Sequence, residues 1–200
     1  RYGASIWECA ATDKWRRVVP AKAGLPVIMS LLQRLFRRPV DPKHGMAPLY
    51  ATVVARGRAV HWYAQGKVPD TLDGRFDMIA AILCLVLLRL EQADRAQESV
   101  WLTELFVDDM DGQLRELGVG DVVVGKHIGR MMSALGGRLA AYRAALEPGG
   151  DLNAALARNL YRGEAPDADA AAHVAAGLRA LEAALAQFSP DALVAGQLPA

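Results

Sequence analysis

Length, composition and charge exclude several classes of protein. The chain has 200 residues, 52% of them hydrophobic and 6% aromatic, which suits one domain with a sizeable core. Its two cysteines provide neither a disulfide framework nor a zinc site. Residues 1–45 carry nine Lys or Arg and three Asp or Glu, a net charge of +6, and the remaining residues carry 14 and 19, a net charge of −5. The acidic body argues against DNA binding, whereas a basic arm is compatible with contact to a membrane surface or a ribosome.

The first 45 residues form two segments of different character. Residues 1–28 show no periodicity, and Met29 resembles a natural start. We therefore interpret residues 1–28 as a disordered or spurious extension, with a transit peptide as the alternative. Residues 29–45 form a basic amphipathic arm in which leucines and arginines of residues 29–38 follow a helical pattern. A helix of this length would contact a membrane only weakly, and a solvated terminal helix is the alternative.

Helical periodicity dominates from residue 46 to residue 188, which we interpret as one helical domain. Ala and Leu are abundant, and β-branched and aromatic residues are few, a composition that favours helix. We predict an all-α fold, a single helical bundle of about six to seven helices. Residues 61–63 are expected to precede a loop, and residues 189–200 to form a frayed tail after a Ser-Pro break. The predicted helices cover residues 47–56, 71–91, 97–117, 122–146, 151–161 and 167–188.

Residues 78–88 are continuously apolar, with Asp77 before them and Arg89 after them. The run is shorter than the roughly 20 residues that span a bilayer, so we expect a central helix buried nearly all round. Cys84 lies within this run, and a buried free thiol in a reducing compartment is the expected state. We expect a cytoplasmic protein, with peripheral contact to the inner membrane as a further option.

Residues 102–132 are predicted to form a helix, a glycine hinge and a second helix. Leu102, Phe106 and Met110 form one apolar stripe at helical spacing, and an acidic row follows a different face. Gly118 suits a helix C-cap, because glycine enters the left-handed region without strain. Asp121 can cap the next helix with its carboxylate.

Two motifs of the sequence resemble the signature of the ubiquinol–cytochrome c chaperone family, and they occur in the same order as in that family. The first contains Phe106, Asp109, Met110, Asp111, Leu114, Arg115, Glu116, Gly118, Val119, Gly120, Asp121, Val124, Lys126 and Met131. The second, upstream, contains Val68, Pro69, Asp70, Thr71, Asp73, Gly74, Arg75, Phe76 and Asp77. A weaker match at residues 49–56 extends the resemblance to roughly residues 48–146. The chain departs from the family at residues 128–137, where an aromatic pair and a second lysine are usual.

The resemblance implies a non-catalytic assembly chaperone for the respiratory complex that contains cytochrome b. Its mitochondrial members bind newly made cytochrome b near the ribosome exit, together with a small partner protein. It therefore implies cytochrome b or another membrane-protein client, with the small partner and the ribosome as further candidates, and no DNA. We expect no cofactor, no metal site and no catalytic residue. A generic helical interaction module for another membrane or ribosomal client is the alternative.

The signature also supplies the candidate site residues. The candidate partner-binding residues are Asp109, Asp111, Arg115, Glu116, Asp121 and Lys126. Those expected to form a hinge or a structural motif are Pro69, Asp70, Gly74, Arg75, Phe76, Gly118 and Gly120. For the acidic residues, ion pairs within the chain are the alternative to partner contact.

Three further patterns allow other interpretations. The acids between Asp108 and Asp111 are of the kind that holds Mg²⁺ in helical isoprenoid or diphosphate enzymes, but we find no second acidic cluster to face them. Gly125, Gly129 and Gly136 share a helix face, which predicts a close approach by another helix of this chain or by a partner. The histidines are scattered, and none is at metal-ligand spacing from another: His44, His61, His127 and His173.

Overall fold

The structure, a computed structural model, describes residues 41–116, 121–164 and 166–199. Over these residues it is all-α and contains no strand. The predicted fold class is therefore confirmed. The expectations for residues 1–28 and for the helix at residues 29–38 lie outside the described residues.

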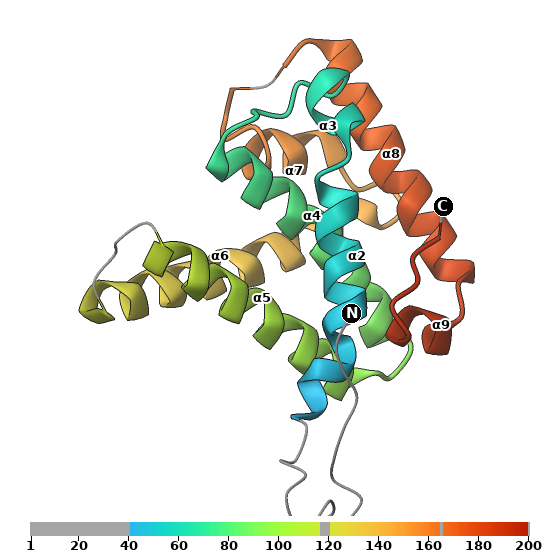
Figure 1. The fold of residues 1–200 in the computed structure, drawn as a ribbon. Helices are drawn as coiled ribbons and strands as arrows, with labels where there is room; N and C mark the ends of the chain where they lie inside the picture. The colour runs from blue at the N-terminus through green and yellow to red at the C-terminus, as the bar shows by residue number, and fades with distance from the viewer. Residues whose placement is uncertain (1–40, 117–120, 165, 200) are drawn as a thin grey trace, which may run out of the picture. The chain divides into compact units, whose positions relative to one another are not determined.

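The helices follow the predicted order closely (Figure 1). Each of the six predicted helices has an observed counterpart with ends within two residues of the prediction. A 3-10 helix and two short α-helices add to them. In chain order the elements are η1 (Pro42–Met46), α2 (Ala47–Gly57), α3 (Val60–Ala64), α4 (Leu72–Gln92), α5 (Ala96–Glu116), α6 (Asp121–Leu146), α7 (Leu152–Asn159), α8 (Ala168–Gln187) and α9 (Pro190–Val194).

Side-chain caps determine where several helices begin. The hydroxyl of Thr71 accepts a hydrogen bond from the backbone N–H of Gly74 at 3.1 Å, at the start of α4. Asp151 and Asp167 do the same at the starts of α7 and α8, each across 2.9 Å. These oxygens satisfy N–H groups that have no acceptor within the helix.

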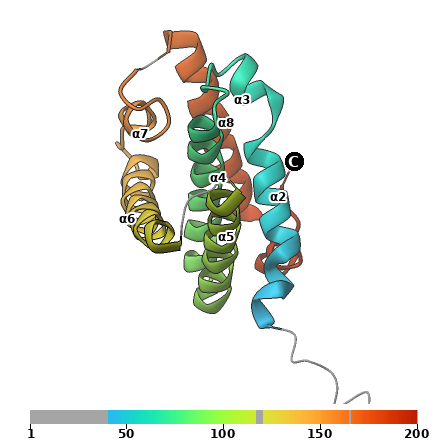
Figure 2. The same ribbon diagram turned by 60° about the vertical axis from the view of Figure 1, so that its left-hand side comes forward.

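Helix α4 forms the centre of the core. Residues 78–87 are all buried, and α2, α5, α6 and α8 contact α4. Figure 2 shows α4 between α6 and α7 on one side and α2 and α3 on the other. Cys84 is fully buried and free, and burial raises the pKa of its thiol to about 12. The prediction of a central buried helix is confirmed.

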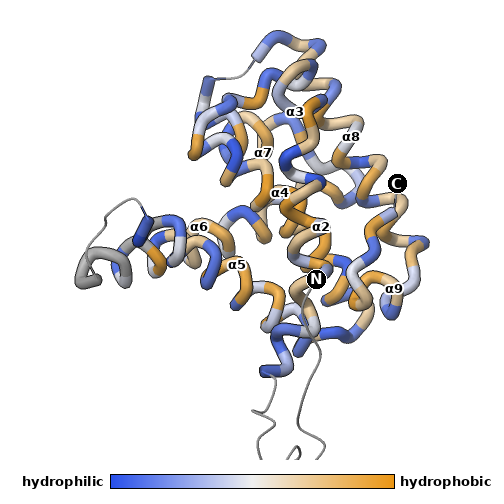
Figure 3. The backbone as a smooth tube through the Cα atoms, in the orientation of Figure 1, coloured by the Kyte–Doolittle hydropathy of each residue, from blue (hydrophilic) through white to orange (hydrophobic). Residues whose placement is uncertain are grey.

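Helices α5 and α6 form the predicted antiparallel pair. Leu102, Phe106 and Met110 are buried along α5, and Leu135 and Tyr142 along α6. Figure 3 shows hydrophilic and hydrophobic residues alternating along α5, as expected of a helix with one buried face. The C-terminal half of α5 and the N-terminal half of α6 extend away from α2, α3 and α8 (Figure 1).

Two short helices pack on the core in addition to the six predicted ones. Residues 60–64 form α3, whose Trp62 is buried and donates from Nε1 to the carbonyl of Arg56 at 2.8 Å. Residues 190–194 form α9, whose Leu193 is fully buried. Thr52 also donates to the carbonyl of Gly196 at 2.8 Å. The segment expected to form a frayed tail thus contains a short helix and contacts α2.

Candidate functional site

Acidic side chains of α5 form contacts with other residues of this chain. The hydroxyl of Tyr50, on α2, donates to Oδ2 of Asp109 at 2.6 Å. Burial, followed by this hydrogen bond, raises the pKa of Tyr50 well above its usual value. Asp111 pairs with Arg115, one turn further along, at 2.6 Å. The two contacts go to different helices, since Tyr50 lies on α2 and Arg115 on α5 itself.

The neighbouring Asp108 meets the start of the described chain. Its carboxylate accepts from the ammonium group of Lys43 at 2.8 Å. This hydrogen bond raises the pKa of Lys43. Among the described residues, no group of three His, Cys, Asp or Glu side chains is placed to hold a metal ion. No observation here favours the diphosphate enzyme considered from the sequence.

The other candidate partner-binding residues lie near the turn between α5 and α6. Glu116 and Lys126 are exposed. Asp121 is the first residue of α6, so it lies one position inside the helix that we expected it to cap. Gly118, Gly120 and the side chain of Asp121 lie outside the described residues. Of the six candidates, the structure brings Asp111 and Arg115 together through a side-chain contact.

The upstream motif forms the entry into α4. At Gly74 an added Cβ would lie 2.0 Å from the carbonyl oxygen of Pro69, so only glycine fits there. Arg75 pairs with Asp70 across 2.6 Å, and this contact lowers the pKa of the Asp70 carboxyl. Phe76 lies 5.6 Å from Phe106 between ring centroids. The motif thus folds the chain back on itself and links α4 to α5.

A buried carboxylate at the next position ties three segments together. Asp77 is fully buried and accepts from Arg138 of α6 at 2.5 Å and from Nε of Arg162, after α7, at 2.7 Å. Arg162 also donates to Asp73 at 2.7 Å, and the guanidinium of Arg138 lies 5.5 Å from the ring centroid of Phe76. Burial raises the pKa of Asp77, and the two guanidinium groups act in the opposite direction.

Sequence reasoning missed this arrangement. Asp77 belonged to the recognised motif but was interpreted only as the residue before an apolar run. Its partners Arg138 and Arg162 are 61 and 85 positions away, and no local pattern indicates them. The available signal was a carboxylate directly before residues 78–88, a run that is apolar on every face of the helix, because a buried charge requires a partner.

A groove lies beside this arrangement, between the N-terminal part of α4 and the facing sides of α5 and α6. We call it the α4–α6 groove. Its cavity volume is about 480 Å³, and Phe76, Met110, Met131, Arg130 and Arg138 are among its lining residues. Asp73 and Arg75 of the entry motif of α4 also line it, together with Leu72.

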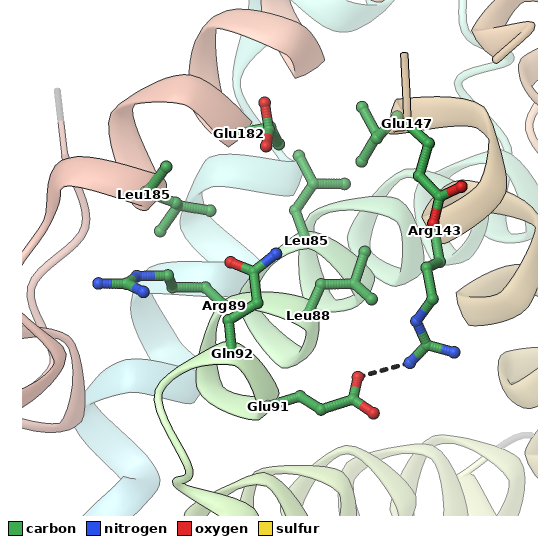
Figure 4. Close-up of a pocket in the computed structure, with 11 residues that line it drawn as sticks. Leu85, Leu88, Arg89, Glu91, Gln92, Arg143, Glu147, Glu182 and Leu185 are labelled. Atoms are coloured by element: carbon green, nitrogen blue, oxygen red, sulfur yellow. Dashed lines mark hydrogen bonds and ion pairs between the residues drawn. The ribbon is translucent and has the colours of Figure 1, made fainter. Parts of the chain in front are cut away.

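A second cavity, of about 340 Å³, lies where the C-terminal half of α4 meets α6 and α8 (Figure 4). Glu91 and Arg143 form an ion pair at its edge. Arg89 reaches the carbonyl of Phe188 at 2.9 Å. Two further acids, Glu147 and Glu182, line it, so its charges are of both signs and do not favour an anion.

The glycine face of α6 is open. A Cβ added at Gly125, Gly129 or Gly136 would meet nothing within 4 Å. We expected these glycines to pack either against another helix of this chain or against a partner. For the described residues, the first of these predictions is wrong. The option of close approach by a partner remains a prediction.

Two histidines that we described as scattered meet in the fold. Nδ1 of His61, on α3, lies 3.1 Å from Nε2 of His173, on α8. The two positions are 112 residues apart, so their spacing gave no indication of the contact. Burial, followed by the proximity of His173 and Arg56, lowers the pKa of His61.

Comparison with known proteins identifies the family. The sequence profile described as Ubiquinol-cytochrome C chaperone matches residues 64–200. The chain belongs to the ubiquinol–cytochrome c chaperone family. A solved structure described as the crystal structure of the Cbp3 homolog from Brucella abortus is similar, with 32% sequence identity and a TM-score of 0.67. The similarity covers 86% of this chain and 94% of that one. A search of curated proteins gave no match.

The family match includes both signature motifs and the residues that hold Asp77. It begins at residue 64, before the entry motif of α4, and extends beyond α9. Across the described residues, no helix is both long enough and apolar enough to cross a bilayer.

Proposed function

We propose that this chain is a non-catalytic assembly chaperone of the ubiquinol–cytochrome c reductase complex and that its client is newly made cytochrome b. The family match over residues 64–200 carries the proposal. The similarity to a Cbp3 homolog over most of both chains supports it. A small partner protein, the ribosome and a membrane surface reached through residues 29–38 are further contacts that we propose for the same task.

We assign client contact to the open face of α6 and the adjoining corner. Each interior glycine of a helix costs about 1 kcal/mol relative to alanine, and no helix of the described chain packs on Gly125, Gly129 or Gly136 to offset that cost. Small residues allow membrane helices to approach each other closely. Glu116 and Lys126, both exposed, place charges beside this face that can orient a client.

The function can be tested in a bacterium that lacks its own family member. Expression of this chain should restore cytochrome b in the membranes, measured by reduced-minus-oxidised difference spectra, and cytochrome b should co-purify with the chain. Co-purification of a different membrane protein, with no change in cytochrome b, would favour the generic interaction module instead.

The client face can be tested separately with a photo-crosslinking amino acid. The probe at Gly129 should capture cytochrome b, whereas the probe at Ala180, an exposed residue of α8, should not. Capture from both positions, or only from Ala180, would contradict the assignment of the face while leaving the client established.

A further inference from the structure

The α4–α6 groove has apolar walls that are open to a ligand. Leu72 and Phe76 of α4, Met110 of α5 and Met131 of α6 line it. Leu72 is 59% exposed, although removal of a leucine side chain from water is energetically favourable. The volume of about 480 Å³ lies within the range of about 300–1,000 Å³ typical of small-molecule sites.

Five arginines line the same groove, and one carboxylate, that of Asp73, lines it with them. Asp73 is held by Arg162, so it does not repel an anion as a free carboxylate would. Three of the five arginines form ion pairs with the carboxylates described above: Arg75, Arg138 and Arg162.

The remaining two arginines have charges that no ion pair balances within the described residues. Arg58 follows α2 and Arg130 lies on α6, and both side chains are exposed. Neither lies within 4.0 Å of a carboxylate in the described part of the chain. A guanidinium group presents a planar set of N–H donors that matches a carboxylate or a phosphate.

We propose that the α4–α6 groove binds a single-chain anionic amphiphile from solution, with its carboxylate or phosphate on Arg58 and Arg130 and its acyl chain against the apolar walls. The apolar walls alone would accept any hydrophobic molecule. The two unbalanced guanidinium groups restrict the choice to anions. The cavity in Figure 4 lacks this combination, because its arginines are accompanied by three acids.

A small ligand fits the groove better than a protein partner does. A stable protein interface buries about 800 Å² on each partner and usually contains several apolar anchors. Among the described residues, the exposed large hydrophobic side chains are Val60, Leu72, Val100 and Met132. Of these four, only Leu72 belongs to the groove, so the apolar surface of the groove does not continue onto the surrounding protein surface.

Calorimetric titration of the whole chain with dodecyl phosphate, below its micelle concentration, tests the proposal. We expect saturable binding at one site. Arg58→Glu with Arg130→Glu should weaken it at least tenfold, and Leu72→Asp should also weaken it. The matched control is Arg158→Glu with Arg179→Glu, which makes the same charge change at two exposed arginines outside the groove and should bind as the unmodified chain does. If the reversed pair does not fold, Arg58→Gln with Arg130→Gln replaces it.

Three results would overturn the proposal. One is equal binding of dodecyltrimethylammonium, which has the same tail and a cationic head. Another is equal loss of binding in the control variant, which would indicate a general charge effect. The third is the absence of binding to dodecyl phosphate, including the case in which only vesicles of dioleoylphosphatidylglycerol bind, because the surface would then contact a bilayer. None of these results bears on whether cytochrome b is the client.

Discussion

Arg162 donates from Nε to Oδ2 of Asp77 at 2.7 Å, although the two residues are 85 positions apart. Arg162 has a φ of +52°, in the left-handed region that costs a non-glycine residue about 1–2 kcal/mol. The same guanidinium group also binds Asp73. One strained arginine therefore holds a fully buried and an exposed carboxylate of the same helix.

We expect the two carboxylates to differ sharply in their effect on stability. Asp77→Ala should lower the free energy of unfolding by about 3–5 kcal/mol, because it leaves the largely buried guanidinium group of Arg138 without its partner. Asp73→Ala, the matched control, removes a side chain that is 68% exposed and should cost about 1 kcal/mol or less. Urea denaturation measures both. Equal, small losses would show that Asp77 is not ionised and paired in the folded protein.

Two glycines should respond to alanine in opposite directions. Gly74→Ala would bring a Cβ to 2.0 Å from the Pro69 carbonyl oxygen, so it should destabilise the fold by about 1–3 kcal/mol through overpacking. Gly129→Ala meets nothing within 4 Å and should stabilise α6 by about 0.5–1 kcal/mol. Thermal unfolding followed by circular dichroism separates the two. A stabilising Gly74→Ala would contradict the close approach at the start of α4.

Substitutions of two acids of α5 should also differ in their effect on stability. Asp109→Lys removes the acceptor of the Tyr50 hydroxyl and should cost about 1.5–3 kcal/mol, the range for a hydrogen bond to a charged group. Asp111→Lys loses one ion pair along the helix surface and should cost about 0.5 kcal/mol. Tyr50→Phe, Asp109→Ala and their combination form a double-mutant cycle, in which a coupling energy near zero would contradict a structural role for Asp109.

Stability should fall in mild acid because His61 is partly buried and lies beside His173. Since the folded protein lowers the pKa of His61 from its ordinary value of about 6.5, the folded state disfavours its protonated form. The stabilising effect is therefore complete above pH ~6.5 and is lost as the pH falls through the lower pKa of the folded state. The midpoint of thermal unfolding, measured from pH 8 to pH 5, should decline over that window.

His61→Asn supplies the control for this pH dependence. Its side chain keeps a hydrogen-bonding group but does not titrate, so the decline below pH ~6.5 should become shallower. An unchanged pH profile in this variant would assign the acid sensitivity to other groups.

The main helices could be predicted because their signals are local. The apolar run at residues 78–88 is visible in the sequence, and it had the expected outcome in α4. Helices α3 and α9 could not be predicted in the same way, because five residues are too few to show a period. Distant contacts hold them instead: a Cβ added at Gly177 of α8 would lie 2.7 Å from the Trp62 ring.

The candidate site could be predicted only in part. The motif at residues 69–76 indicated the entry into α4, and Gly74 and Phe76 have clear structural roles there. The sequence did not indicate which acid of α5 contacts the rest of the fold, because Asp109 accepts a hydrogen bond from Tyr50, which is 59 positions away. The α4–α6 groove was missed for the same reason, since its arginines come from four helices or their ends and share no sequence pattern.

The hydrogen bond from Thr52 to the carbonyl of Gly196 joins residues 144 positions apart, and this separation determines when the domain can be completed during synthesis. A growing chain emerges from the ribosome with its N-terminal part first. Helix α2 therefore remains without part of its cover until residues 190–199 have left the exit tunnel, even though α4 and its neighbours can pack earlier. A newly made copy therefore becomes fully protected from proteolysis only after residues 190–199 have joined the fold.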